Sequence, residues 1–197
     1  MLIIAYLCGS INSAIITCFF LGLPSPRSVG SGNPGATNVL RVGGKLAALI
    51  TLTGDALKGF IPVIIAHFIG LNHTEVAYIA LAGVLGHIFP LFFAFKGGKG
   101  VATLIGVMFG FDWPIGLIFI GLWLIFALVT GYSSLSALIA SVIAAVSVIF
   151  MVSFASAMPF LIIAAFVILR HRQNIVKLLN GTESKIGQKS QNHGKST

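Results

Sequence analysis

The sequence predicts an all-α integral membrane protein with about seven transmembrane helices, its N-terminus outside and its C-terminus in the cytoplasm. Hydrophobic residues make up 57% of the 197 residues and charged residues only 8%, whereas a soluble domain carries roughly 25%. Apolar runs recur along almost the whole chain, and a helix pairs its own backbone polar groups inside lipid. We expect one transmembrane domain over residues 1–186 and a flexible polar cytoplasmic tail over residues 187–197.

The apolar runs follow one another with short polar connections. The first is interpreted as a retained span, because no basic stretch of a signal peptide precedes it and the first charge is Arg27. The fourth is shorter than the ~20 residues that cross ~30 Å of hydrocarbon, so it is either a short or tilted buried helix or a re-entrant segment. The runs are Met1–Leu23, about Lys45–Gly70, Val76–Phe95, Val101–Phe111, Ile115–Thr130, Leu135–Ser153 and Met158–Leu169.

The distribution of basic residues gives the orientation. If all seven runs cross, one side receives the loop after the first run, Lys96–Gly100, Gly131–Ser134 and the C-terminal segment. Of the 12 Lys and Arg residues, every one except Lys58 falls on that side, so it is the cytoplasmic one. This asymmetry supports counting the fourth run as a crossing. It also explains the net charge of +8 without a nucleic-acid partner.

A small polar stretch, Ser31–Asn38, lies between the first two runs. Its Gly and Asn residues reach backbone conformations that let successive N–H groups point at one spot, and such a nest suits a phosphate. The hydroxyls of Ser31 and Thr37 and the nearby Arg41 add donors. The alternative is an ordinary polar turn. The candidate binding residues are Ser31, Gly32, Asn33, Gly35, Ala36, Thr37 and Asn38.

A second anion site is predicted at Lys96–Gly100, where glycines, two lysines and the start of the fourth run coincide. The spacing is not that of a Walker A motif, and two ordinary cytoplasmic lysines are the alternative. Because Arg41 and the Arg170–Arg172 group lie on the same face, we favour a phosphate-binding pocket. The candidates in this loop are Lys96, Gly97, Gly98 and Lys99.

Three of the polar residues inside the apolar runs are candidates for a special role. Asp55 and Lys58 are three residues apart on one helical face and can pair, as a structural clamp or as part of a site. His87 is either a hydrogen-bonded packing residue or a binding residue. Only Asp55 and Glu183 are acids on the cytoplasmic side, so paired-carboxylate catalysis and carboxylate-bound magnesium are disfavoured, and no metal or cofactor is expected. Any catalysis would rest on cations, N–H groups and hydroxyls.

These motifs resemble those of the bacterial acyl-phosphate:glycerol-3-phosphate acyltransferases of the PlsY type. The resemblance covers nearly the whole chain. It implies a seven-span inner-membrane enzyme that transfers a fatty acyl group from acyl phosphate to glycerol 3-phosphate, forming lysophosphatidic acid for phospholipid synthesis. It also implies that no protein base is needed, because the departing phosphate takes the hydroxyl proton. The matching stretches are Gly30–Asn38 with Arg41, Asp55–Gly59, Gly86–Pro90, Phe95–Thr103, and His171–Ile175 with Gly181 and Glu183.

From the predicted sites and this resemblance we form a hypothesis for the role of each residue. Ser31–Asn38 would hold the donor phosphate, Arg41, Lys99 and Ser134 would hold glycerol 3-phosphate, and His171 and Asn174 would orient the acceptor hydroxyl or the developing oxyanion. An apolar groove open to lipid would take the acyl chain. The chain departs from the family at Ser25-Pro26-Arg27, usually Asp-Ile-Arg, and at Gly131, usually Arg; the serine of that loop is Ser134 or Ser136.

Two other function classes fit a basic multi-span protein. A transporter or channel for an anionic, phosphorylated solute would need a polar path through the membrane, yet the outer halves of the spans are almost free of polar groups. The other class is a non-catalytic membrane-anchored partner of a lipid-synthesis complex. Formation of lysophosphatidic acid by purified protein from acyl phosphate and glycerol 3-phosphate would separate the enzyme from both.

Overall fold

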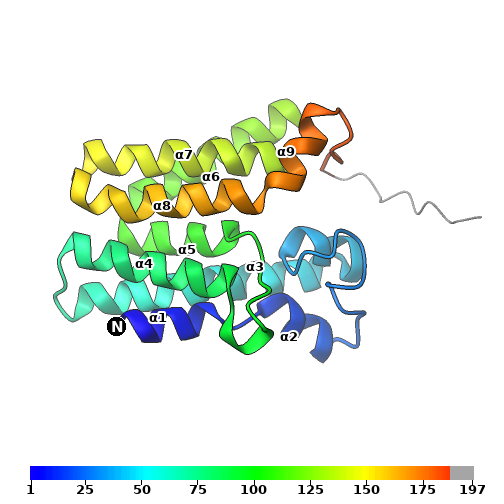
Figure 1. Ribbon diagram of the computed structural model, residues 1–197, viewed down its shortest axis with the longest axis horizontal. Helices are drawn as coiled ribbons and strands as arrows, with labels where there is room; N and C mark the ends of the chain where they lie inside the picture. The colour runs from blue at the N-terminus through cyan, green and yellow to red at the C-terminus, as the bar shows by residue number, and fades with distance from the viewer. Residues whose placement is uncertain (187–197) are drawn as a thin grey trace, which may run out of the picture.

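The computed structural model describes residues 1–186 as a bundle of helices, and the predicted tail lies outside these residues. Figure 1 shows most of the helices lying side by side along one direction. No strand occurs within residues 1–186. The helices are α1 (Leu2–Gly9), α2 (Ser13–Phe20), α3 (Ala36–Phe68), α4 (His73–Ile88), the short 3-10 helix η1 (Leu91–Phe93), α5 (Val101–Phe111), α6 (Trp113–Thr130), α7 (Ser133–Met151), α8 (Phe154–Arg170) and α9 (Arg172–Leu179).

The described helices make this a multi-pass membrane protein. Four segments are each long and apolar enough to cross a membrane: α3, α4 together with η1 (His73–Phe93), α6 and α7. The pairs α1–α2, bent by 41°, and α8–α9, bent by 60°, raise that number to six if each pair is one span. Helix α5 has 11 residues, about 16 Å at ~1.5 Å per residue, and is shorter than the hydrocarbon layer.

The first apolar run, predicted as one helix, is broken at residues 10–12. Asn12 accepts a hydrogen bond from the Ile15 N–H at 3.1 Å and so caps α2. The carbonyl of Ile11 accepts one from the Lys58 ammonium at 2.6 Å, and Ser10 Oγ donates to the Tyr6 carbonyl at 2.8 Å. The break is tolerated inside an apolar segment because side chains pair the polar groups that it frees.

The second span begins earlier than its apolar run suggests. Helix α3 starts at Ala36, so the predicted loop Ser31–Asn38 ends inside the first turn of a helix. Gly44, with φ 76° and ψ −172°, interrupts the helical backbone just before the apolar part. The polar residues between Ala36 and Gly44 therefore form a helical extension at the start of α3 rather than part of a loop.

Close packing of α3 against α5 determines the depth of the Lys96–Gly100 loop. A Cβ on Gly106 would lie 1.9 Å from the carbonyl oxygen of Ala56, and one on Gly59 would lie 2.6 Å from that of Thr103. Only glycine permits this approach, as is common between membrane helices. Helix α5 consequently begins level with the middle of α3, and the loop before it is recessed into the bundle.

The two ends of the bundle differ. At one end, the Phe111 ring packs against His67 and His73, and the hydroxyls of Thr74 and Ser156 are 3.1 Å apart. The opposite end holds α9, the start of α3 and the loop that leads into it, which Figure 1 draws together on the right. The connections that the sequence predicts to be cytoplasmic thus gather at one end.

Candidate functional site

The glycine loop Lys96–Gly100 is held from two sides. The N–H groups of Gly97 and Gly98 donate to the Ile88 and His87 carbonyls at 3.2 and 3.3 Å. The Arg170 guanidinium donates to the Gly97 and Gly98 carbonyls at 2.9 and 3.2 Å. A Cβ on Gly98 would lie 2.3 Å from Nε2 of His87, so no larger residue fits there. These contacts fix the backbone from which Lys99 extends.

Lys99 is half-buried at the start of α5 and donates from Nζ to Oδ1 of Asn174 on α9. Burial lowers the pKa of Lys99 to about 8, against the opposing effect of the nearby Glu183 carboxylate. The ammonium form therefore prevails at neutral pH, and its remaining protons can bind an anion.

Glu183 connects Asn174, the hydrogen-bond partner of Lys99, to helix α7. One of its carboxylate oxygens accepts hydrogen bonds from Ser134 Oγ on α7 and from Asn174 Nδ2, both at 2.7 Å. Lys99, Asn174, Glu183 and Ser134 thus form one chain of contacts, which we call the Lys99 cluster. Of the two candidate serines, Ser134 belongs to it, whereas Ser136 donates to the Tyr132 carbonyl of its own helix at 2.8 Å.

Arg41 and His171 border the Lys99 cluster. The exposed guanidinium of Arg41 donates to Ser184 Oγ, next to Glu183, at 3.1 Å. The His171 side chain is 3% exposed, and its Nδ1 lies 2.8 Å from the Val167 carbonyl. A carbonyl only accepts, so Nδ1 carries the proton and Nε2 of the neutral ring is left as an acceptor.

The backbone of the opening loop is more occupied than a phosphate nest requires. The Ser31 N–H donates to Asn38 Oδ1 at 2.9 Å, and those of Gly32 and Gly35 donate to loop carbonyls at 3.1 and 2.9 Å. The Asn33 N–H donates to Ser31 Oγ at 3.4 Å. These groups do not converge outward, because the loop uses them to fold on itself. Within residues 1–186 the N–H groups of Ala36 and Thr37, the first of α3, donate no hydrogen bond.

Asn38 and Arg27 tie the opening loop to its surroundings. The Asn38 side chain, 2% exposed, donates to the Pro26 and Val29 carbonyls at 2.7 and 3.1 Å, so it faces the loop interior. Arg27 donates to the Phe93 carbonyl at 3.2 Å and to the carbonyl of Lys96. The Pro34 carbonyl lies within 3.2 Å of a Cβ placed on Gly98. The two predicted anion-binding loops are therefore neighbours, and the Lys96 side chain is exposed beside them.

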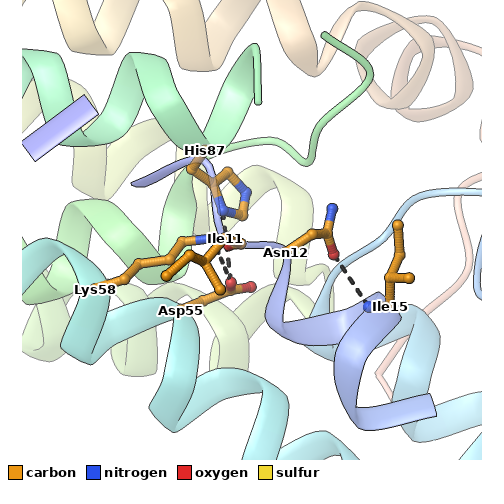
Figure 2. Close-up of polar contacts among 6 residues, drawn as sticks. All are labelled: Ile11, Asn12, Ile15, Asp55, Lys58 and His87. Carbon is orange, nitrogen blue, oxygen red and sulfur yellow. Dashed lines mark hydrogen bonds and ion pairs between the residues drawn. The ribbon is translucent and has the colours of Figure 1, made fainter. Parts of the chain in front are cut away.

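A second ionic group, the Asp55 cluster of Asp55, Lys58 and His87, lies inside the bundle. The predicted Asp55–Lys58 pair is confirmed, with Nζ and Oδ1 2.7 Å apart. His87 Nδ1 is 3.6 Å from the same oxygen, and Figure 2 shows both side chains directed at Asp55 beside Ile11. The three side chains are between 2% and 8% exposed. His87 thus supports the glycine loop through its backbone carbonyl and its ring rather than by facing an open surface.

Three residues that organise this region were not predicted as site residues. Arg170 was noted only as part of a basic group and Glu183 only as an acid within a matching stretch, and Ser184 was not singled out. Arg170 holds the glycine loop, and the other two contact Ser134, Asn174 and Arg41. The signal available for Glu183 was its charge, because it is an acid in an otherwise basic C-terminal segment. No group of three metal-ligating side chains occurs within residues 1–186.

The comparison with known proteins decides the family. A family profile described as glycerol-3-phosphate acyltransferase matches residues 1–181. The chain belongs to this family. Glycerol-3-phosphate acyltransferases of Francisella tularensis subsp. novicida (strain U112) and Francisella philomiragia subsp. philomiragia are 61% and 60% identical to it, over 96% of this chain and 93% of each relative.

Solved structures support the same assignment. PlsY, an integral membrane glycerol 3-phosphate acyltransferase crystallised in its glycerol 3-phosphate form, is 40% identical, with a TM-score of 0.89 over 94% of both chains. Its lysophosphatidic acid form gives 39% identity and a TM-score of 0.86, over 94% of this chain and 93% of that one. The chain is therefore a PlsY-type glycerol-3-phosphate acyltransferase and an enzyme, and these relatives lend no support to a transporter.

Proposed function

We propose that this glycerol-3-phosphate acyltransferase takes its acyl group from acyl phosphate and forms lysophosphatidic acid at the Lys99 end of the bundle. The observation that carries the proposal is the convergence of Lys99, Asn174 and Ser134 beside the glycine loop, with Arg41 at the border. Two phosphates must be bound at once, and cations, amides and hydroxyls are the groups that bind them.

At the acceptor end, Arg41 and Lys99 bind the phosphate of glycerol 3-phosphate, and Ser134 contacts the same substrate. His171 Nε2 is an acceptor when Nδ1 donates to Val167, so it orients the glycerol hydroxyl by accepting a hydrogen bond from it. This favours the first of the two roles predicted for His171, because a neutral acceptor nitrogen cannot stabilise an oxyanion. Asn174 directs Lys99 through its amide oxygen.

At the donor end, we assign the phosphate site to the first turn of α3 rather than to the whole Ser31–Asn38 loop that the sequence predicted. The N–H groups of Ala36 and Thr37 and the exposed Thr37 hydroxyl lie at the positive end of the helix. Ser31, Gly32, Asn33, Gly35 and Asn38 shape the loop that leads into this turn, and Lys96 and the glycines beside it complete the donor pocket. His87 supports the glycine loop through its backbone carbonyl and ring and does not contact the donor phosphate itself.

The chemistry needs no protein base. The glycerol hydroxyl oxygen attacks the acyl carbonyl carbon, the bond between that carbon and the phosphate oxygen breaks, and the departing phosphate takes the hydroxyl proton. The protein supplies positioning and charge stabilisation, which are the terms that cations and fixed hydrogen bonds provide. The acyl chain lies in an apolar groove between spans that is open to lipid.

We place the enzyme in the bacterial inner membrane, with seven crossings, an outside N-terminus and the active site facing the cytoplasm. The excess of Lys and Arg on the connections at the Lys99 end supports this orientation. Residues 1–186 form the single catalytic domain. The basic face also attracts both anionic substrates.

A donor comparison with purified protein tests the proposal. The protein is given glycerol 3-phosphate with acyl phosphate, acyl-CoA or acyl-carrier protein in separate reactions, and lysophosphatidic acid is measured. We expect lysophosphatidic acid only in the reaction that contains acyl phosphate as the donor. Turnover with acyl-CoA or acyl-carrier protein but not with acyl phosphate would overturn the donor assignment, and no product from any donor by folded protein would overturn the reaction.

A further inference from the structure

The segment Gly181–Ile186, the C-terminal strap, follows α9 and is fixed at both ends. Near its start, the Thr182 N–H donates to the Lys177 carbonyl of α9 at 2.8 Å. At its end, the Ile186 N–H donates to the Gly131 carbonyl between α6 and α7, also at 2.8 Å. Glu183 stands between these two anchors. The strap is thus attached to the same elements that carry Asn174 and Ser134.

A carboxylate is unexpected beside the binding site for two anionic substrates. The chain has four acidic residues. Asp55 lies inside the bundle, and Glu75 and Asp112 lie at the opposite end, so Glu183 is the one acid of the described residues at the Lys99 end. Its charge opposes phosphate binding. A role that offsets this cost has to lie in what Glu183 does to its neighbours.

Glu183 determines which way two side chains point their donors. It accepts from Nδ2 of Asn174, so the other end of the amide, Oδ1, faces the Lys99 ammonium. It also accepts the hydrogen bond that the Ser134 hydroxyl donates, so the Ser134 oxygen can act toward other groups only as an acceptor. An acceptor suits a hydroxyl of glycerol better than a phosphate oxygen. The same carboxylate thus gives Lys99 a fixed direction and Ser134 a fixed polarity.

We propose that Glu183 is a positioning residue for acyl transfer: it orients Asn174, the hydrogen-bond partner of Lys99, and Ser134 for glycerol 3-phosphate. The proposal rests on the function proposed above and makes the C-terminal strap part of the active site rather than the beginning of a tail. Glu183 acts through its neighbours and touches neither reacting atom.

The charges around Lys99 give this role a measurable signature. Burial has the largest effect and lowers the pKa of Lys99 to about 8, whereas Glu183 raises it and the surrounding cations lower it further. Removing the carboxylate while keeping its shape should therefore lower the pKa of Lys99 further. The titratable and charged groups that face Lys99 are Glu183, Lys177, Arg170, Arg41 and His171.

The test is the pH dependence of kcat/KM for glycerol 3-phosphate in wild type and in Glu183→Gln. Gln keeps an oxygen that can accept both hydrogen bonds but carries no charge. We expect the loss of activity on the alkaline side, near pH 8 in wild type, to begin about one pH unit lower in the variant. The KM for glycerol 3-phosphate at pH 8 should rise about tenfold. Glu75→Gln, at the opposite end, should match wild type.

Two further variants keep the test decisive if Glu183→Gln folds poorly. Glu183→Asp retains the charge at a shorter reach, so its alkaline limb should stay near that of wild type while kcat falls. Lys99→Arg should abolish the limb both with and without Glu183→Gln, because an Arg guanidinium stays protonated. Thermal unfolding of each purified variant separates these effects from loss of fold.

Several results would overturn the proposal. One is an alkaline limb that does not move in Glu183→Gln, and another is tighter glycerol 3-phosphate binding in that variant, which would make the carboxylate a competitor of the phosphate. A limb that moves equally in Glu183→Asp would also contradict it. A wild-type protein that makes no lysophosphatidic acid from acyl phosphate would instead refute the proposed function, so the two failures are distinguishable.

Discussion

The two ionic clusters of this enzyme contain similar residues and differ in how completely neighbouring groups neutralise their charges. In the Asp55 cluster, Lys58 is 2.7 Å from Asp55 and 2.6 Å from the Ile11 carbonyl, and all three side chains are buried. In the Lys99 cluster, the ammonium donates to an amide and keeps protons free, and the neighbouring Arg41 is exposed.

The difference separates a structural ion pair from the proposed binding site. The Asp55 cluster balances its charge within the protein and joins α3 to the break between α1 and α2. Around Lys99, cations outnumber the single carboxylate, so that end of the bundle attracts anions. A charge inside a membrane protein is thus a stronger sign of a site when it is incompletely neutralised by its neighbours.

The largest effect is expected from removing the lysine of the Asp55 cluster. Lys58→Ala leaves the Asp55 carboxylate buried without its main partner, which typically costs about 3–5 kcal/mol. We expect the free energy of unfolding, measured by denaturation in detergent micelles, to fall by that amount. Asp55→Ala combined with Lys58→Ala should recover part of it. A single variant as stable as wild type would show that the pair is not a clamp.

Lys99→Ala should affect catalysis rather than folding. The variant loses the half-buried ammonium that we propose binds the acceptor phosphate, so kcat/KM for glycerol 3-phosphate should fall about a hundredfold or more. The unfolding temperature should stay within about 2 °C of wild type. Lys45→Ala, an exposed lysine on the same face, should keep activity within about twofold. Near-wild-type turnover by Lys99→Ala would contradict the acceptor site.

Arg41→Ala should have a smaller effect of the same kind. The guanidinium is exposed and reaches the site from its border, where water weakens its attraction for phosphate. We expect kcat/KM to fall about thirtyfold and the loss to lie mainly in KM for glycerol 3-phosphate. Steady-state kinetics at two ionic strengths would check this, since added salt should narrow the gap between variant and wild type.

The smallest effect concerns pH. Because the pKa of Lys99 is lowered to about 8, the lysine is charged below that pH and loses its proton above it. Phosphate loses its second proton near pH 6, so glycerol 3-phosphate affinity should be highest between about pH 6 and 8. In Lys99→Arg the alkaline decline should disappear, whatever the cost to kcat. A decline that persists in that variant would assign it to another group.

Local sequence predicted much of the fold and part of the site. Hydropathy located the long helices, and the i, i+3 spacing of Asp55 and Lys58 predicted their pairing. It did not predict the break at Asn12, because the flanking apolar residues dominate any hydropathy window. The start of α3 at Ala36 was missed for the opposite reason, since its first turn is polar.

The contacts within the site were beyond sequence reasoning because they join distant segments. Lys99 and Asn174 are 75 residues apart, and Ser134 and Glu183 are 49 apart. Glycine content suggested that the Ser31–Asn38 backbone is open to a ligand. Instead, the Asn38 side chain folds the loop inward, and a composition signal contains no information about where a buried amide points.

The most direct test of the account is chemical labelling of Lys99 in the wild-type enzyme. With a pKa of about 8, its amine should react readily with an acylating reagent at pH 8, and mass spectrometry can follow each lysine separately. The account predicts that glycerol 3-phosphate alone slows labelling of Lys99 at least fivefold and leaves Lys45 unaffected. Equal labelling of Lys99 with and without saturating glycerol 3-phosphate would contradict the central claim.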